Sequence, residues 1–205
     1  MQVAVVDTGT ANLASMLAAL RRHGTTPRLT RDASAIADAE LLVLPGVGAF
    51  GAGMAQLCAS ALVDSLAERV RSERPFLAVC LGLQLLCETS EESPGVAGIG
   101  VVSSAVQRFP SEASGTRLVV PQLGWNEVVP RPDSILLERG HAYYANSYHL
   151  PAIPAGFSGA ESVHGVRFVA ALERGPMLAC QFHPELSGTW GHALLGRWLE
   201  RGRAC

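Results

Sequence analysis

Apolar and polar positions along the first half of the chain follow two alternating periods. Short apolar runs of strand length are separated by segments in which apolar residues recur every three or four positions, as on one face of a helix. These periods predict helices at 12–22, 33–39 and about 54–72, and strands at 3–6, 26–29, 41–44 and in the run that ends at Cys80. Alternation of strand and helix predicts a parallel sheet with helices on both faces, so the expected fold class is a three-layer α/β domain.

The pattern changes after Pro94, where short apolar pairs and triplets are separated by Pro and Gly. An amphipathic helix is predicted at 190–201. The short apolar segments predict shorter strands, many of them antiparallel, at 101–102, 118–120, 128–129 and 135–137. Because no repeat, low-complexity tract or linker interrupts the chain, residues 1–205 are expected to form one domain, with a mostly parallel central sheet and a small antiparallel addition.

Composition narrows the class of protein. The 205 residues are 48% hydrophobic and 17% charged, which suits one compact domain with a sizeable core. The net charge of −2 provides no basic field for nucleic acid, and no apolar run approaches the ~18 residues of a membrane span. The N-terminus lacks a positively charged start and is interpreted as a first strand, not a signal peptide.

The cysteines predict a compartment and bear on metal binding. An odd count of five at irregular spacing is typical of free thiols in a reducing cytoplasm. Cys180 and His183 form half of a C-x-x-H zinc pattern, but no second half follows. Neither a metal nor a cofactor is therefore expected.

Cys80 lies where a strand-like run passes directly into a helical pattern that begins at Leu81. A thiol at such a junction is lifted out of the sheet and faces the first turn of the helix. The free N–H groups and the dipole of that turn favour a thiolate and can donate to an oxyanion. The alternative is a small core residue, which is what a single buried cysteine usually is.

His183 and Glu185 follow another strand-like run, at 177–180. In an extended chain, residues two apart point the same way, which suits a base and the carboxylate that orients it. Cys80, His183 and Glu185 thus form a nucleophile, base and orienter set in chain order. A histidine taken alone is more often a surface or satisfied core residue, but the joint context is hard to explain as packing.

A glycine-rich loop follows the predicted strand at 41–44. Gly46 and Gly48 flank Val47 and let one peptide plane turn freely, so a backbone N–H there can join that of Leu81 in an oxyanion hole. The alternative is a plain turn. The loop lacks the Lys-Ser or Lys-Thr ending of a Walker phosphate loop.

Polar residues near Cys80 are candidates for substrate contacts. Gln84 lies one helical turn after Cys80, where its amide can bond to a polar substrate. Glu91 and Glu92 can pair with a substrate ammonium, although an acidic pair in a loop is normally solvated.

These residues resemble a known family. The Cys80 elbow and the segment Gln181-Phe182-His183-Pro184-Glu185 are similar to class I (triad) glutamine amidotransferases. Segments in the right order along nearly the whole chain resemble, within that class, the glutaminase subunits of imidazole glycerol phosphate synthases; these are 7–15, Pro45-Gly46-Val47-Gly48-Ala49-Phe50, Leu123-Gly124-Trp125-Asn126 and Ser147-Tyr148.

The resemblance implies a role for each matching position. Cys80 is the nucleophile, His183 the base and Glu185 its orienter. The backbones of Val47, which must turn, and Leu81 complete the oxyanion hole. Three further matches are implied to contact L-glutamine: Gly48, Gln84 and Glu92. Four others are implied to meet a (βα)8-barrel cyclase that receives the ammonia: Asn12, Leu123, Trp125 and Leu186.

The chain departs from the family pattern at several positions. Ala78 stands where the family commonly has Gly, Gln122 and Asn146 stand where it has His, and Leu186 stands where it has Lys. The triad is intact and several of these changes fall on the partner side, so they bear on which synthase the chain serves more than on glutamine hydrolysis. Three other readings stay open: a paralogous glutaminase that feeds a different synthase, a thiol peptidase on the same fold, and a non-catalytic binding subunit.

Overall fold

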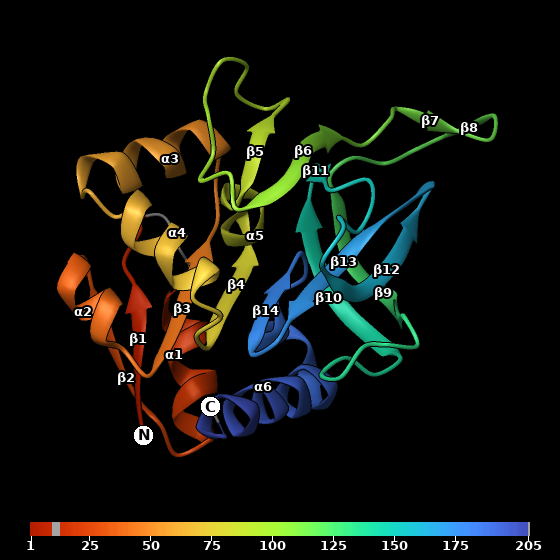
Figure 1. Ribbon diagram of the computed structural model, residues 1–205. Coiled ribbons are helices and arrows are strands. Elements are labelled where there is room, and N and C mark those ends of the chain that lie inside the picture. Colours follow the sequence, from red (N-terminus) through yellow and green to blue (C-terminus); the bar gives the residue numbers. More distant parts are fainter. Residues whose placement is uncertain (10–12, 205) are drawn as a thin grey trace.

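The computed structural model describes residues 1–9 and 13–204, so the predicted start of the first helix at Asn12 lies outside the described residues. The first half of the chain alternates strand and helix as expected (Figure 1). Its elements are β1 (Gln2–Val6), α1 (Leu13–Arg22), β2 (Thr26–Thr30), α2 (Ala33–Asp38), β3 (Leu41–Gly46), α3 (Phe50–Ala59), α4 (Val63–Arg71), β4 (Phe76–Cys80) and α5 (Leu81–Leu85).

The second half supplies mainly strands and the closing helix. Its elements are β5 (Cys87–Ser90), β6 (Val102–Arg108), β7 (Glu112–Ala113), β8 (Thr116–Arg117), β9 (Gln122–Pro130), β10 (Gly140–Asn146), β11 (Tyr148–His149), β12 (Ser158–His164), β13 (Val166–Arg174), β14 (Met177–Cys180), the 3₁₀ turn η1 (Pro184–Leu186) and α6 (Gly188–Arg203). The β7–β8 hairpin projects from the upper right of Figure 1.

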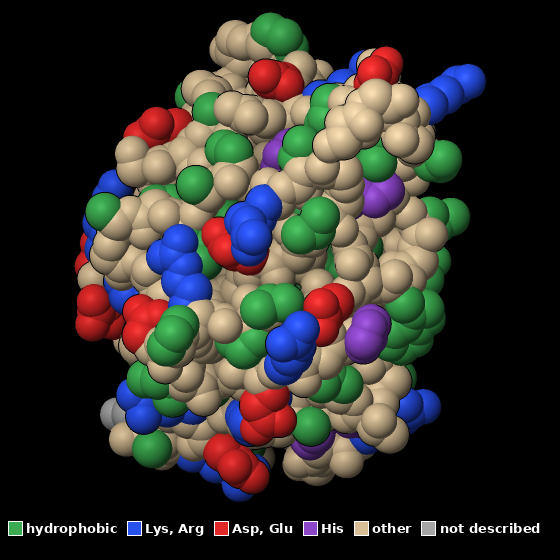
Figure 2. Space-filling model, turned by 90° about the vertical axis from the view of Figure 1, so that its right-hand side faces the viewer, with side chains coloured by type: hydrophobic (Ala, Val, Ile, Leu, Met, Phe, Trp, Pro, Cys, Tyr) green, Lys and Arg blue, Asp and Glu red, His purple; other side chains and the backbone are tan. Residues whose placement is uncertain are grey.

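One nine-stranded sheet runs through the described molecule in the order β10-β9-β12-β13-β14-β4-β3-β1-β2. The strands from β14 to β2 pair in parallel, and those from β10 to β14 pair antiparallel. The α/β fold class is confirmed, and the antiparallel part is larger than the small addition expected. Figure 2 faces the side of the molecule that carries this part, where hydrophobic side chains lie among charged ones.

Alternation along the strands divides the core between two faces of the sheet. Leu41 and Val43 pack with α1 and α6, whereas Leu42 and Leu44 pack with α2, α3 and α4. Side chains alternate across a strand, so one apolar run in β3 supplies both faces. The result is the predicted three-layer arrangement.

The single helix predicted at 54–72 is wrong, because α3 and α4 meet at 99°. Ala61 between them has φ 53, in the left-handed region, and the Leu62 N–H donates to the Leu57 carbonyl. In one straight helix these leucines would point about 140° apart, but the bend buries both. Among the described residues, no single helix is long and apolar enough to cross a membrane.

Two predicted strands are also absent from the described structure. The N–H groups of Ile135, Leu136 and Leu137 donate to the carboxylate of Glu173 instead of to a neighbouring strand. Residues 118–120 form a loop before Pro121, which has no N–H for a ladder, and Val119 is 76% exposed.

Candidate active site

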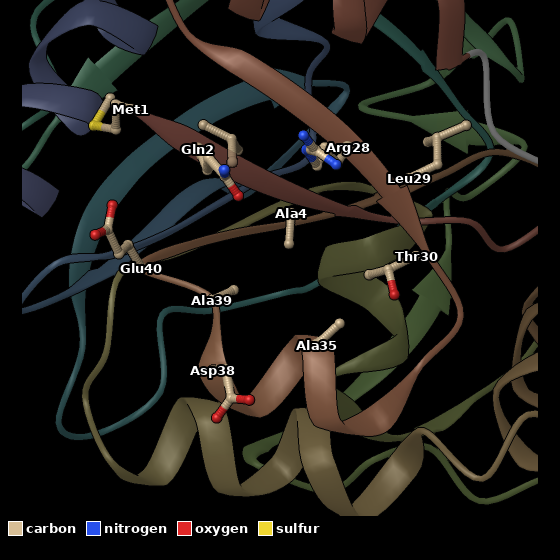
Figure 3. A pocket seen from close by; sticks show the side chains of 11 residues that line it. Met1, Gln2, Ala4, Arg28, Leu29, Thr30, Ala35, Asp38, Ala39 and Glu40 are labelled. Atoms are coloured by element: carbon tan, nitrogen blue, oxygen red, sulfur yellow. The ribbon is translucent and has the colours of Figure 1, made fainter.

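Size alone does not identify the active site. A hollow of about 690 Å³ lies between β1, β2 and α2, and Figure 3 shows charged side chains at its rim, among them Arg28, Asp38 and Glu40. The described residues that line it include neither Cys nor His. The chemistry gathers in a smaller pocket of about 250 Å³ at the carboxyl ends of β3 and β4, which is where α/β sheets bind ligands.

The smaller pocket brings together most of the predicted site. It is lined by Val47, Gly48, Cys80, Leu81, Gln84, Glu92 and His183, and by five residues to which the sequence analysis gave no role, Pro121, Ala145, Asn146, Ser147 and Tyr148. The latter come from the loop before β9 and from the end of β10 through β11. The motif Ser147-Tyr148 and the departure at Asn146 were the sequence signals for that wall.

Cys80 forms the expected elbow. It is the last residue of β4 and the cap of α5, with φ 53 and ψ −109. A residue with a side chain rarely adopts this conformation, and strain of this kind costs on the order of 1–3 kcal/mol. The Cys80 side chain consequently leaves the sheet and opens onto the pocket, as predicted.

Glycines let the elbow lie directly on β3. A Cβ atom at Gly82 would lie 2.1 Å from the Leu44 carbonyl oxygen, and one at Gly46 would lie 2.8 Å from the Gly82 nitrogen. Ala78 has no such constraint, because it is an ordinary strand residue that pairs with Leu44 and Ala179. The departure from Gly at position 78 therefore fits within the core.

The other described cysteines are less suited to nucleophilic chemistry. Burial raises the pKa of Cys87 and of Cys180 well above the ordinary thiol value, with nearby carboxylates adding to the effect. Cys58 is exposed on α3 and lies outside the pocket lining. Cys80 is thus the thiol that shares the pocket with a histidine.

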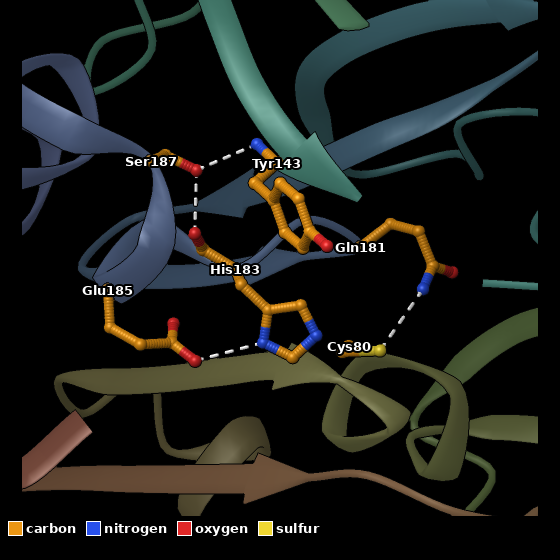
Figure 4. Close-up of polar contacts among 6 residues, drawn as sticks. All are labelled: Cys80, Tyr143, Gln181, His183, Glu185 and Ser187. Carbon is orange, nitrogen blue, oxygen red and sulfur yellow. Dashed lines mark hydrogen bonds and ion pairs between the residues drawn. The ribbon is translucent and has the colours of Figure 1, made fainter. Parts of the chain in front are cut away.

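His183 and Glu185 form a buried pair (Figure 4). Their Nδ1 and Oε1 atoms are 2.9 Å apart, and a carboxylate only accepts, so Nδ1 carries the proton and donates. The pairing itself was expected, but the reason given for it, an extended chain between the two residues, is wrong. Pro184–Leu186 is a 3₁₀ turn that folds Glu185 back beneath the imidazole.

The pair holds His183 in its charged form. Burial by itself lowers the pKa of the imidazole, but hydrogen bonds to Cys80 and Glu185, with their negative charges, outweigh burial and raise the pKa to about 10. In this form His183 can donate a proton, and once it has done so its neutral imidazole can accept one.

The backbone around His183 is clamped by a residue that sequence reasoning missed. The Ser187 hydroxyl donates to the His183 carbonyl at 2.6 Å and accepts from the Tyr143 N–H at 2.9 Å. In return, the His183 N–H donates to the Tyr143 carbonyl. The hydroxyl two residues after Glu185 was the available signal.

Two predicted glutamine contacts have other partners. Both N–H groups of Gln84 are committed, one to the Tyr148 carbonyl at 3.1 Å and one to Gln181 Oε1 at 3.0 Å. With both N–H groups used, the group that Gln84 has left for a further partner is its acceptor oxygen. Glu92 accepts from the Phe50 N–H at 2.7 Å at the start of α3, although it still lines the pocket.

Three of the four residues predicted to meet a partner are exposed, and the fourth, Asn12, lies outside the described residues. Leu123 is 69% exposed, Trp125 58% and Leu186 38%. Leu123 and Trp125 share a shallow hollow with the exposed Val119 and Val163, and Pro121 lines both this hollow and the Cys80 pocket. Four exposed apolar side chains therefore lie beside the pocket, in a hollow that Gln122, Asn126 and His164 also line.

No group of three or more His, Cys, Asp or Glu side chains that could hold a metal ion occurs among residues 1–9 and 13–204. The C-x-x-H pair of the sequence does not face a common site, since Cys180 is fully buried and His183 is hydrogen-bonded to Glu185.

Similar proteins agree with the geometry of the pocket. The family model "Glutamine amidotransferase class-I" matches residues 4–200. Proteins named "Imidazole glycerol phosphate synthase subunit HisH" are 39% identical in Deinococcus radiodurans, over 96% of this chain and 92% of that one, and 40% identical in Xanthomonas axonopodis, over 97% and 96%. The protein "Imidazole glycerol phosphate synthase hisHF, chloroplastic" of Arabidopsis thaliana is 37% identical over 97% of this chain and 34% of its own length.

Solved structures show the same fold at lower identity. A glutamine amidotransferase matches with a TM-score of 0.76 at 20% identity, over 98% of each chain. The glutaminase domain of Trypanosoma brucei CTPS matches with a TM-score of 0.70 at 16% identity, over 100% of this chain and 94% of that one. From the family match and the full-length relatives together, the chain belongs to the class I glutamine amidotransferases and, within them, to the family of imidazole glycerol phosphate synthase HisH subunits.

Proposed function

We propose that the chain hydrolyses L-glutamine to glutamate and ammonia, and passes the ammonia to a (βα)8-barrel cyclase as the glutaminase subunit of imidazole glycerol phosphate synthase. The observation that carries the proposal is the strained Cys80 elbow and His183 in one small pocket, with Glu185 hydrogen-bonded to His183. Full-length relatives with this name supply the choice of synthase. We place the protein in a reducing cytoplasm, where the Cys80 thiol stays free.

The first half of the reaction makes a thioester. The Cys80 sulfur attacks the side-chain amide carbon of glutamine, and the carbonyl electron pair moves onto oxygen. The backbone N–H groups of Val47 and Leu81 donate to that oxyanion. His183 gives its proton to the amide nitrogen, the C–N bond breaks, and ammonia leaves.

The second half regenerates the enzyme. His183 takes a proton from water as the water attacks the thioester carbon. The C–S bond then breaks, glutamate leaves, and the sulfur and imidazole return to their starting pair. Glu185 keeps the imidazole oriented in both halves, and dividing one amide cleavage into two steps lowers the highest barrier.

The pocket argues against the peptidase reading. Its volume of about 250 Å³ lies below the roughly 300–1,000 Å³ of sites for larger ligands, and it suits a small amide better than an extended peptide. The non-catalytic reading is disfavoured by the coupling of all three candidate catalytic side chains.

The group of exposed apolar residues beside the pocket is the candidate docking face for the cyclase. Its members are each more than half exposed and line one hollow with Pro121; they are Val119, Leu123, Trp125 and Val163. The Arabidopsis relative is consistent with a companion unit, since most of its length lies beyond the matched part.

We expect the isolated chain to be a weak glutaminase that its cyclase partner stimulates once the acceptor substrate binds. Gly46 and Gly48, the latter with φ +98, let the Val47 peptide turn at low cost, so the oxyanion hole can rest unformed. Stimulation by about 100-fold needs roughly 3 kcal/mol of differential contact. Glutamate release is measured with and without the cyclase.

Matched variants locate the docking face. Trp125→Ala is expected to remove most of the stimulation and to leave the isolated rate unchanged. Leu29→Ala, at an exposed position on β2 at the other edge of the sheet, should change neither rate. Full activity without any partner would contradict the switch, and stimulation only by a different synthase would support the paralogue instead.

Affinity for the partner is further expected to depend only weakly on salt concentration, because of the residue at position 186. Leu186 has no charge, so a screened ion pair cannot form there. Partner affinity is measured from 50 to 500 mM salt for the natural chain and for Leu186→Lys. The lysine variant should show the steeper dependence, and a steep loss already in the natural chain would contradict the argument.

A further inference from the structure

Gln181 is a fully buried polar residue that the reaction described above does not use. It follows β14 directly, and its N–H donates to the Ala170 carbonyl at 2.8 Å. Its side-chain Nε2 lies 3.7 Å from the Cys80 sulfur, within hydrogen-bond reach of sulfur. Figure 4 shows this amide on the side of Cys80 away from Glu185.

The orientation of the Gln181 amide is set by a chain of neighbours. The Tyr148 carbonyl can only accept, so the Gln84 group that faces it must be the NH₂. The same NH₂ faces Gln181, which must therefore present its oxygen to Gln84, at 3.0 Å. The NH₂ of Gln181 is left to face the sulfur.

A donor at this place discriminates between the two forms of the sulfur. A thiolate accepts the N–H bond, and hydrogen bonding to a charged form favours that form. A thiol would gain more from an acceptor for its S–H. The buried amides beside Cys80 are thus arranged for thiolate.

We propose that Gln181 is a positioning residue for the nucleophile, whose side-chain N–H holds the Cys80 sulfur in its attacking form while Gln84 and the Tyr148 carbonyl fix the direction of that N–H. The inference rests on the proposed function, because it assigns a second partner to the same nucleophile. It also explains how the sulfur keeps its place when His183 turns its proton toward the leaving nitrogen. In this arrangement Gln84 contributes by orienting Gln181 in addition to lining the pocket.

The test measures Cys80 reactivity without glutamine. The full chain is treated with iodoacetamide from pH 5 to 10, and labelling is read at the Cys80 peptide by mass spectrometry, which separates it from the exposed Cys58. In Gln181→Met we expect the pH midpoint of labelling to rise by about one unit and kcat to fall about 10-fold, the size of one hydrogen bond to a charged group. KM for glutamine should change less than kcat.

Controls separate positioning from packing. Gln122→Met changes another buried glutamine, whose Oε1 has no hydrogen-bond partner within the described part of the chain, and should leave the midpoint in place. Gln84→Met should raise the midpoint less than Gln181→Met, because the donor remains but its direction is free. If Gln181→Met does not fold, Gln181→Glu preserves the shape, replaces the donor by an acceptor, and should raise the midpoint as well.

The outcomes distinguish this inference from the proposed function. A folded Gln181→Met or Gln181→Glu chain with the natural midpoint would overturn the role of Gln181, even if the natural chain hydrolyses glutamine. A raised midpoint in a protein that never releases glutamate would support the role of Gln181 and reject the glutaminase. An equal rise in Gln122→Met would show a general packing effect and would also overturn the proposal.

Discussion

Cys80→Ser is expected to lower glutamate release by about 10³-fold or more while the chain stays folded. A hydroxyl is a much poorer nucleophile than a thiolate beside an imidazole tuned for sulfur. Serine fills nearly the same space, and the strained backbone at φ 53 is set by the elbow and its glycine contacts, not by the sulfur. Activity is measured in the presence of partner, and folding by circular dichroism and thermal unfolding.

The remaining cysteines provide the controls. Cys58→Ala lies on the surface and should change neither activity nor stability. Cys87→Ala and Cys180→Ala remove buried sulfur atoms and should reduce stability without abolishing turnover. Cys205, which lies outside the described residues, should likewise tolerate Ala. Retained turnover in Cys80→Ser, with the natural yield of glutamate, would reject the assignment of the nucleophile.

His183→Ala is expected to lose nearly as much activity as Cys80→Ser. The fall in activity caused by Glu185→Gln should be about 10- to 100-fold smaller than the fall caused by His183→Ala. Other triads show this order when the base and the orienting residue are removed in turn. His183 carries the proton, whereas Glu185 orients the imidazole through the 2.9 Å bond and stabilises its charge. Steady-state kinetics of the two variants test the order. An inactive Glu185→Gln beside an active His183→Ala would reverse the roles.

The same pair predicts a pH dependence of stability. The folded-state pKa of His183 is raised to about 10, so the stabilisation from its charge is full below the ordinary value near 6.5. That stabilisation is lost as the pH rises from there toward 10. The destabilisation by Glu185→Gln should therefore be largest near pH 6 and shrink toward pH 10, as measured by urea unfolding across this range. A destabilisation that grows with pH would contradict the pairing.

Local patterns sufficed for the parallel half of the fold. The run at Leu41–Gly46 is apolar on both faces and could only be a buried strand, and its neighbours alternate with helices that carry one apolar stripe. The elbow was equally local, because Cys80 joins a strand pattern to a helix pattern without a linking residue. The assignment of Leu123 and Trp125 to a partner interface came from the resemblance and stays a prediction; both residues are exposed.

The predictions of secondary structure were wrong where a contact with a group distant in the sequence decided the local conformation. The helix predicted at 54–72 bends because burying both Leu57 and Leu62 against the sheet outweighs helical continuation, and burial depends on what lies across the core. The segment 135–137 is not a strand because the Glu173 carboxylate takes its N–H groups. A periodic pattern carries no information about a side chain almost forty positions away.

The sequence by itself predicted the chemistry of the triad, since residue type and chain order indicate a nucleophile, a base and an orienter. Only the tertiary structure decided how these groups are held. It folds Glu185 under His183 through a 3₁₀ turn, clamps His183 through Ser187 and Tyr143, and aims Gln181 at the sulfur. Each of these contacts depends on the direction of a donor across the sheet or between loops, and direction is set by packing, which spacing along a chain does not encode.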